Sequence, residues 1–154
     1  MFVQMTLGAT MIVATTVIEG AFTISGVSAL RRHISARQRK SNIQSTLVLS
    51  GFVLWLFLAT IFEIWTWAML YLLLGIVTSL EEAVYFSTVN FTTLGYGDII
   101  LGPEWRLLAS FEAANGLLLF GWSTALVFVA VQWVYEHNQK LPQHQAKEAS
   151  RPRA

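Results

Sequence analysis

One short stretch of the sequence, residues 91–98, combines residue types that can bind a cation through the backbone. It reads Phe-Thr-Thr-Leu-Gly-Tyr-Gly-Asp, with Gly95 and Gly97 on either side of a tyrosine. Glycine adopts backbone angles that other residues avoid, so successive carbonyl oxygens of such a segment can point to one side. A ring of carbonyls can replace the water shell of potassium. The stretch therefore predicts a cation site made of main-chain oxygens.

The composition indicates that this stretch lies in a membrane protein. Of the 154 residues, 55% are hydrophobic and only 12% are charged. Soluble domains carry about 25% charged residues. The formal net charge is +1, there is no cysteine, and the three histidines at 33, 137 and 144 do not cluster. We therefore expect no disulfide, no zinc or haem site, and no cofactor beyond a permeant ion.

Three apolar segments are long enough to cross a bilayer, which takes about 20 helical residues. We predict membrane-spanning helices at 1–30, 46–77 and 103–135. The first is not expected to be a signal peptide, because its basic cluster follows the apolar run. The fold class expected is therefore an all-α membrane protein with three transmembrane helices.

A short amphipathic segment precedes the glycine-rich stretch. We predict a helix at 79–92, started by two overlapping capping boxes, Thr78 with Glu81 and Ser79 with Glu82. A helix of this length covers only about 20 Å and cannot cross a bilayer. A short helix followed by a loop at 93–98, between two spanning helices, is typical of a re-entrant hairpin. Such a loop must line a water-filled path, since lipid cannot satisfy its polar groups.

The basic residues predict the topology. Five of the ten Lys and Arg lie within residues 31–40, inside a predicted cytoplasmic loop at 31–45, and four lie in a predicted disordered tail at 136–154. An anionic-lipid or nucleic-acid contact is the alternative for the loop. The N-terminus is then outside the cell membrane and the C-terminus cytoplasmic. The predicted outer mouth carries four acids that would concentrate cations, namely Glu81, Glu82, Asp98 and Glu104.

Residues 46–135 resemble the pore module of potassium channels, because a spanning helix, a short helix, Thr-Thr-Leu-Gly-Tyr-Gly-Asp and a second spanning helix follow in that order. The module is most similar to small prokaryotic channels of the two-helix type, here with an extra helix in front. The resemblance implies a pore helix at 79–92 and a selectivity filter at 93–98. Because one chain supplies one filter segment, it also implies a homotetramer with cyclic symmetry.

The resemblance assigns roles in the filter. Thr93 would bind K+ through its hydroxyl and carbonyl, and Leu94, Gly95 and Tyr96 through their carbonyls, while Gly97 closes the outer mouth. Leu94 stands where the family more often has valine. Its side chain is expected to point away from the ions and to tune conduction.

Residues around the filter are expected to support it. Thr92 precedes it, Asp98 follows it, and Tyr85 and Phe86 match an aromatic cuff around the filter tyrosine. Some relatives pair the aspartate with a glutamate of the pore helix, but Val89 occupies that position here. The resemblance therefore implies that this brace is missing.

Acids within the apolar segments are functional candidates by default, although structural roles remain open for each. Two tryptophans follow Glu63 closely, so we expect this residue near the outer interface. Glu19 is expected to bind a serine or threonine of a neighbouring helix. Glu112 and Asn115, one turn apart, are expected to form hydrogen bonds behind the pore helix and to support the filter.

The last helix contains candidates for a hinge and a gate. Gly116 and Gly121 resemble the hinge region of the family, with close packing through small residues as the alternative. One face from Gly116 offers residues for the cavity or for an apolar gate, namely Phe120, Thr124, Phe128 and Gln132.

These observations predict a potassium-selective channel that conducts K+ passively across the plasma (inner cell) membrane as a homotetramer in the lipid bilayer. A weakly selective cation channel and a non-conducting membrane subunit are the alternatives. We expect no enzymatic activity and no nucleic-acid partner. A phosphate cradle is disfavoured because no lysine lies near the glycines. Voltage sensing is disfavoured because the first helix lacks an arginine ladder.

Overall fold

The computed structural model of the chain describes residues 1–35 and 42–149. Over these ranges the chain forms four helices: α1 (Phe2–Ser35), α2 (Asn42–Leu73), α3 (Leu80–Phe91) and α4 (Arg106–Ala149). Three of them contain segments long and apolar enough to cross a membrane, namely Phe2–Arg32, Ile43–Leu73 and Arg106–Glu136. The prediction of an all-helical chain with three such helices is confirmed.

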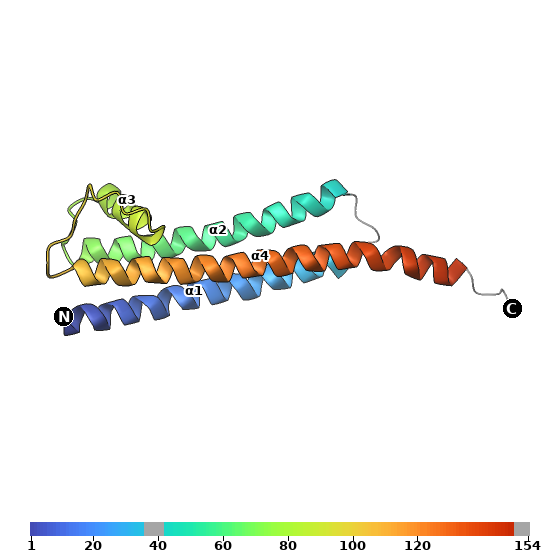
Figure 1. The fold of residues 1–154 in the computed structure, drawn as a ribbon, viewed down its shortest axis with the longest axis horizontal. Helices are drawn as coiled ribbons and strands as arrows, with labels where there is room; N and C mark the ends of the chain where they lie inside the picture. The colour runs from blue at the N-terminus through green and yellow to red at the C-terminus, as the bar shows by residue number, and fades with distance from the viewer. Residues whose placement is uncertain (36–41, 150–154) are drawn as a thin grey trace.

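The three long helices lie against one another, and α3 covers one end of them (Figure 1). α1 and α4 run in the same direction, and α2 runs antiparallel to both. α3 packs obliquely on α2 and α4 at the end of the bundle where α1 begins. The loops before and after α3 lie at this same end.

Two apolar clusters hold the helices together. The larger one surrounds α3 and includes the fully buried Trp67, Tyr71, Phe91 and Leu108. The smaller one joins the other halves of α1, α2 and α4. Many large apolar side chains elsewhere on the long helices are exposed. Helices that are apolar on all sides are typical of membrane spans, whose outer faces contact lipid.

The end of α2 differs from the prediction of residue 77. The helix ends at Leu73, and Gly75 follows with a φ of 65°. The N–H of Gly75 donates to the carbonyl of Leu72 at 3.1 Å, and the N–H of Ile76 donates to that of Tyr71 at 3.0 Å. This pair of bonds is a Schellman motif, in which glycine provides the left-handed residue that terminates a helix.

Other boundaries also differ from the prediction. α1 continues through Arg31 and Arg32, which were predicted in the basic loop, because arginine is a good helix former. α2 begins before residue 46, and residues 36–41 of the predicted loop lie outside the described part of the chain. α4 begins after a turn at Pro103 and continues to Ala149. The predicted disordered tail is therefore wrong up to this residue, because its Glu, Gln, Lys and Ala residues also favour helix.

Candidate functional site

The start of α3 is fixed by a serine cap. Ser79 has extended backbone angles, and its hydroxyl accepts a hydrogen bond from the N–H of Glu82 at 3.1 Å. Thr78 instead donates from its hydroxyl to the Glu82 carboxylate at 3.5 Å. Of the two predicted capping boxes, the structure therefore uses the serine. The acids Glu81 and Glu82 lie in the first turn, where they suit the positive end of the helix dipole.

The loop after α3 is tied back to the last turn of that helix. The N–H of Thr93 donates to the carbonyl of Asn90 at 2.9 Å. The N–H groups of Leu94 and Gly95 donate to the carbonyl of Val89 at 3.0 and 3.3 Å. Within the described residues, no backbone N–H outside the helices donates to a carbonyl of the loop between 93 and 97. The N–H groups of these three residues thus face α3, and the carbonyl oxygens of the loop remain available as ligands.

The sign of the backbone angle φ alternates along this loop. Thr93, Gly95 and Gly97 have φ values of 60°, 57° and 76°, whereas Leu94 and Tyr96 between them have negative φ. Alternating handedness turns successive carbonyls to one side, whereas an extended strand alternates them. A positive φ is unusual for a β-branched residue such as threonine, and strained angles of this kind gather at functional sites. The loop can therefore present a row of carbonyl oxygens to a cation.

Asp98 is held by Tyr85, which lies in the second turn of α3. The Tyr85 hydroxyl donates to Asp98 Oδ2 at 2.5 Å, and both side chains are exposed. This hydrogen bond holds the pKa of the Asp98 carboxyl below its ordinary value. Val89, by contrast, is buried and apolar, as expected from its side chain. The aspartate thus has a brace, which the tyrosine at position 85 provides and the residue at position 89 does not.

A buried carboxylate lies behind α3. Glu112 of α4 is fully buried and accepts hydrogen bonds from Tyr71 of α2 at 2.8 Å and from Asn90 of α3 at 2.8 Å. The Ser87 hydroxyl of α3 donates to its other oxygen. Asn90 also donates to the Ala109 carbonyl at 2.8 Å. The carboxylate therefore joins α2, α3 and α4 at the height of the last turn of α3.

The closest approach of α4 to α3 occurs at Gly116. A Cβ atom at this position would overlap the carbonyl oxygen of Phe91, the last residue of α3. Phe120, one turn later on α4, contacts the Phe91 ring edge-on with centroids 5.8 Å apart. A Cβ at Gly121, by contrast, would meet nothing within 4 Å. Packing within one chain therefore explains the glycine at position 116, where a side chain would collide with α3, but not the glycine at position 121.

The comparison with known proteins agrees with this geometry. A family described as "Ion channel" matches residues 50–132, which is more than half of the chain. The chain belongs to this ion channel family. No curated protein and no solved structure matches it. The match includes α3, the loop after it and most of α2 and of the apolar part of α4, whereas α1 lies outside it.

In this channel, α1 is attached to α4 through polar side chains. Asn115 Nδ2 donates to the Thr15 hydroxyl at 2.7 Å, so Asn115 does not join Glu112 behind α3 as predicted. The Ser123 hydroxyl donates to Glu19 at 2.8 Å, which is the kind of contact expected for this acid. Glu63 of α2 is also buried, within electrostatic range of Glu19. Its side of α2 therefore faces α1, and its expected depth near the outer interface stays a prediction.

Most of the other residues predicted to act in the pore are exposed in the single chain. Thr93, Leu94, Gly95, Tyr96, Gly97 and Asp98 are exposed, and Thr92 is half-buried as the C-cap of α3. Phe86 packs edge-on against Tyr71 at 5.1 Å, so within one chain it supports α3 and does not reach Tyr96. On α4, Thr124, Phe128 and Gln132 are exposed. These exposed groups are available to other copies of the chain or to a pore.

Three residues that support the site were not predicted from the sequence: Tyr71, Ser87 and Asn90. Asn90 offered a signal, since an amide near the apolar end of a helix needs a buried partner. Tyr71 and Ser87 offered none, because both residues also occur in ordinary membrane helices. Their shared hydrogen-bond partner, Glu112, depends on how α2 and α3 pack on α4, which the sequence does not specify.

We predict that Gly116→Ala displaces the end of α3. The added methyl overlaps a backbone carbonyl, which cannot rotate away, and overpacking of this kind costs about 1–3 kcal/mol. The thermal unfolding midpoint of the purified channel should fall, and ion flux should change with it. Gly121→Ala is the matched control and should be neutral or slightly stabilising, because alanine favours helix. Equal effects of the two substitutions would contradict the close contact.

We predict that Glu112→Gln destabilises the region behind α3. Glutamine is neutral: its oxygen can still accept from Tyr71 and Asn90, while its amide N–H faces the Ser87 hydroxyl, so the hydrogen bonds lose the carboxylate charge that strengthens them, at a cost of about 1–3 kcal/mol. Hydrogen exchange of the α3 amides should become faster. Glu104→Gln makes the same chemical change at an exposed residue and should leave exchange unaltered. Unchanged exchange in Glu112→Gln would count against a supporting role.

We predict that Tyr85→Phe raises the pH at which Asp98 loses its charge. In the wild type the tyrosine hydroxyl lowers the pKa of Asp98, so the carboxylate stays ionised further into the acidic range. Without the hydroxyl, Asp98 takes up its proton at higher pH. NMR titration of the Asp98 carboxyl carbon would measure the shift. Tyr135→Phe, an exposed tyrosine of α4, is the control, and an equal midpoint in both variants would refute the brace.

Proposed function

We propose that this ion channel is selective for potassium and that the segment from Thr93 to Gly97 is its selectivity filter. The alternation of φ along this segment carries the proposal, because it suits a row of carbonyls on one side. Such a row replaces the hydration shell of K+ when several copies surround one axis. The N–H groups of Thr93, Leu94 and Gly95 are bonded to α3, which keeps them away from the cation.

α3 would act as a re-entrant pore helix. Its 12 residues are too few to cross a bilayer, and it lies at one end of three helices that are long enough. Its last turn ends at the loop and would point its partial negative charge toward the pore centre. Glu81 and Glu82 sit at its opposite, partially positive end. The helix dipole would therefore favour a cation beneath the filter.

Four copies would complete the site. One chain contributes a single row of carbonyls, and the filter residues are exposed in the single chain. The exposed groups Thr124 and Phe128 of α4 would then line the pore below the filter, with Phe128 as an apolar constriction. The acids at the α3 end would face outward, together with the N-terminus of α1. The basic end of α1 and the C-terminus of α4 would lie in the cytoplasm.

Ion flux from liposomes that contain the purified protein tests the proposal. We expect K+ flux that greatly exceeds Na+ flux and that barium blocks. Gly95→Ala should abolish the selectivity, since alanine at a left-handed φ costs about 1–2 kcal/mol and disturbs the carbonyl row. Tyr96→Ala should do the same by removing the filter side chain. Gly20→Ala, where a methyl meets open space in α1, is the control.

The outcomes separate the alternatives. Equal K+ and Na+ flux would identify a weakly selective cation channel, for which Leu94 is the residue to exchange first. Absence of flux from a correctly assembled protein would identify a non-conducting subunit. Selectivity that survives Gly95→Ala would place the filter elsewhere in the chain.

A further inference from the structure

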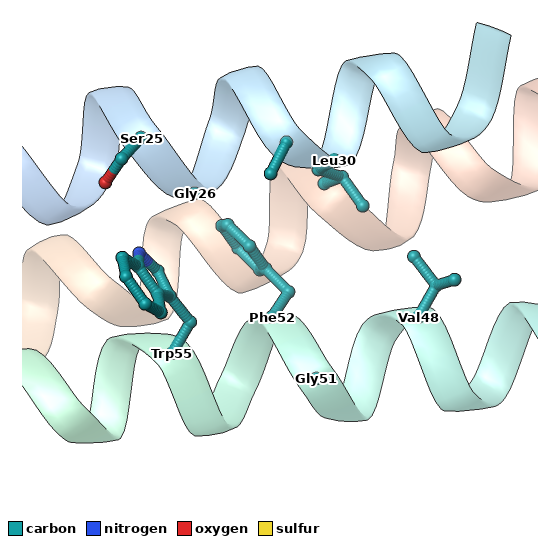
Figure 2. A pocket seen from close by; sticks show the side chains of 8 residues that line it. Ser25, Gly26, Leu30, Val48, Gly51, Phe52 and Trp55 are labelled. Carbon is teal, nitrogen blue, oxygen red and sulfur yellow. The ribbon is translucent and has the colours of Figure 1, made fainter. Parts of the chain in front are cut away.

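A groove runs between α1 and α2 in the half of the molecule away from α3 (Figure 2). Its volume is about 470 Å³, and apolar side chains form most of its wall. The residues that shape it are Gly26 and Leu30 of α1 and Val48, Gly51, Phe52 and Trp55 of α2. Both helices are membrane-spanning candidates, so the groove would open toward the acyl chains of the bilayer.

Two glycines and one tryptophan create the groove. At Gly26 a Cβ would come within 2.7 Å of the Trp55 ring, so the glycine lets this ring lie across α1. The indole N–H donates to the Phe22 carbonyl at 3.0 Å, which fixes the ring and closes that end of the groove. At Gly51 a Cβ would meet nothing within 4 Å, so the missing side chain leaves the wall hollow. The groove thus exists because position 26 leaves room for the indole ring and position 51 has no side chain to fill the wall.

The other end of the groove leads to a basic residue. Arg32 lies three residues after Ala29 and seven after Ser25, which both line the groove, so it continues the same face of α1. Its Nε donates to the Ser28 carbonyl at 3.2 Å, and the side chain is exposed. Arg31, on a different face, stacks over Trp133 at 4.6 Å. Among the basic residues that the structure describes, Arg32 is therefore the one that continues the groove face of α1.

We propose that this groove binds an acyl chain of an anionic phospholipid whose phosphate pairs with Arg32. An apolar slot that ends at an exposed guanidinium complements a molecule with an apolar chain and a negative head. Each methylene buried in the slot strengthens binding, and a basic residue near the membrane surface favours an anionic headgroup. The lipid would join α1 to α2. This proposal depends on the spanning helices and not on potassium selectivity.

Native mass spectrometry of the full-length channel tests the proposal. Protein equilibrated with phosphatidylserine or with phosphatidylcholine of the same chains should retain the anionic lipid preferentially. Gly51→Leu fills the hollow wall and should weaken retention of phosphatidylserine about tenfold or more. Arg32→Gln should lower the preference for phosphatidylserine over phosphatidylcholine about fivefold. Gly20→Leu, which also adds a leucine where a Cβ meets open space, should change neither.

Each other outcome overturns the proposal. Equal retention of the two lipids by the wild type removes the role of charge, and equal retention by Gly51→Leu and Gly20→Leu removes the groove. A Gly51→Leu protein that retains lipid but loses its oligomeric state would make the groove an interface between copies. Val48→Phe fills the groove from a second position, so a folding defect in one variant leaves the test intact.

Discussion

The Glu112 carboxylate is the contact on which the arrangement around the loop at 93–97 depends. It is fully buried, and its hydrogen bonds come from one residue of α2 and two of α3. A buried charge is tolerable only when its hydrogen bonds are satisfied, so α2 and α3 cannot shift on α4 without exposing an unpaired group. Asn90, one of the donors, precedes the loop by two residues and also provides the carbonyl that binds the N–H of Thr93. The carboxylate therefore determines where the loop begins.

The loop depends in turn on the backbone contact at Gly116. The end of α3 rests against α4 without an intervening side chain, and Phe120 packs on the Phe91 ring next to it. Close backbone contacts of this kind are stiff, because no side chain can change rotamer to absorb a displacement. A tilt of α4 at this point would move the Phe91 carbonyl, and the loop would follow through its bonds to the last turn of α3. α4 and the loop at 93–97 are thus mechanically connected.

The sequence predicts the elements of this channel better than their contacts. Hydropathy and caps place the three long helices and α3, because these depend on local residues and on the bilayer length. The end of α2 was missed although Gly75 is visible in the sequence, since apolar residues continue beyond it to Val77. Glu112 was correctly placed behind α3, but its donors depend on helix rotation, which the sequence does not specify. Tyr85 was predicted to pack around Tyr96, and its bond to Asp98 requires the three-dimensional course of the loop.

α1 lies outside the part of the chain that matches the ion channel family, yet specific polar contacts hold it against α4 and α2. Its contacts Thr15–Asn115 and Glu19–Ser123 both fall on the side facing α4. Rotating a helix by one residue turns this side through about 100°, so any other register breaks both bonds at once. A single polar contact between membrane helices contributes on average about 0.6 kcal/mol, which is too little to fix a helix alone. Two contacts of this kind, together with the indole bond of Trp55 to α1, select one register. The extra helix is therefore built into the bundle through α4 and α2, and a ligand of the groove would act where α1 meets α2.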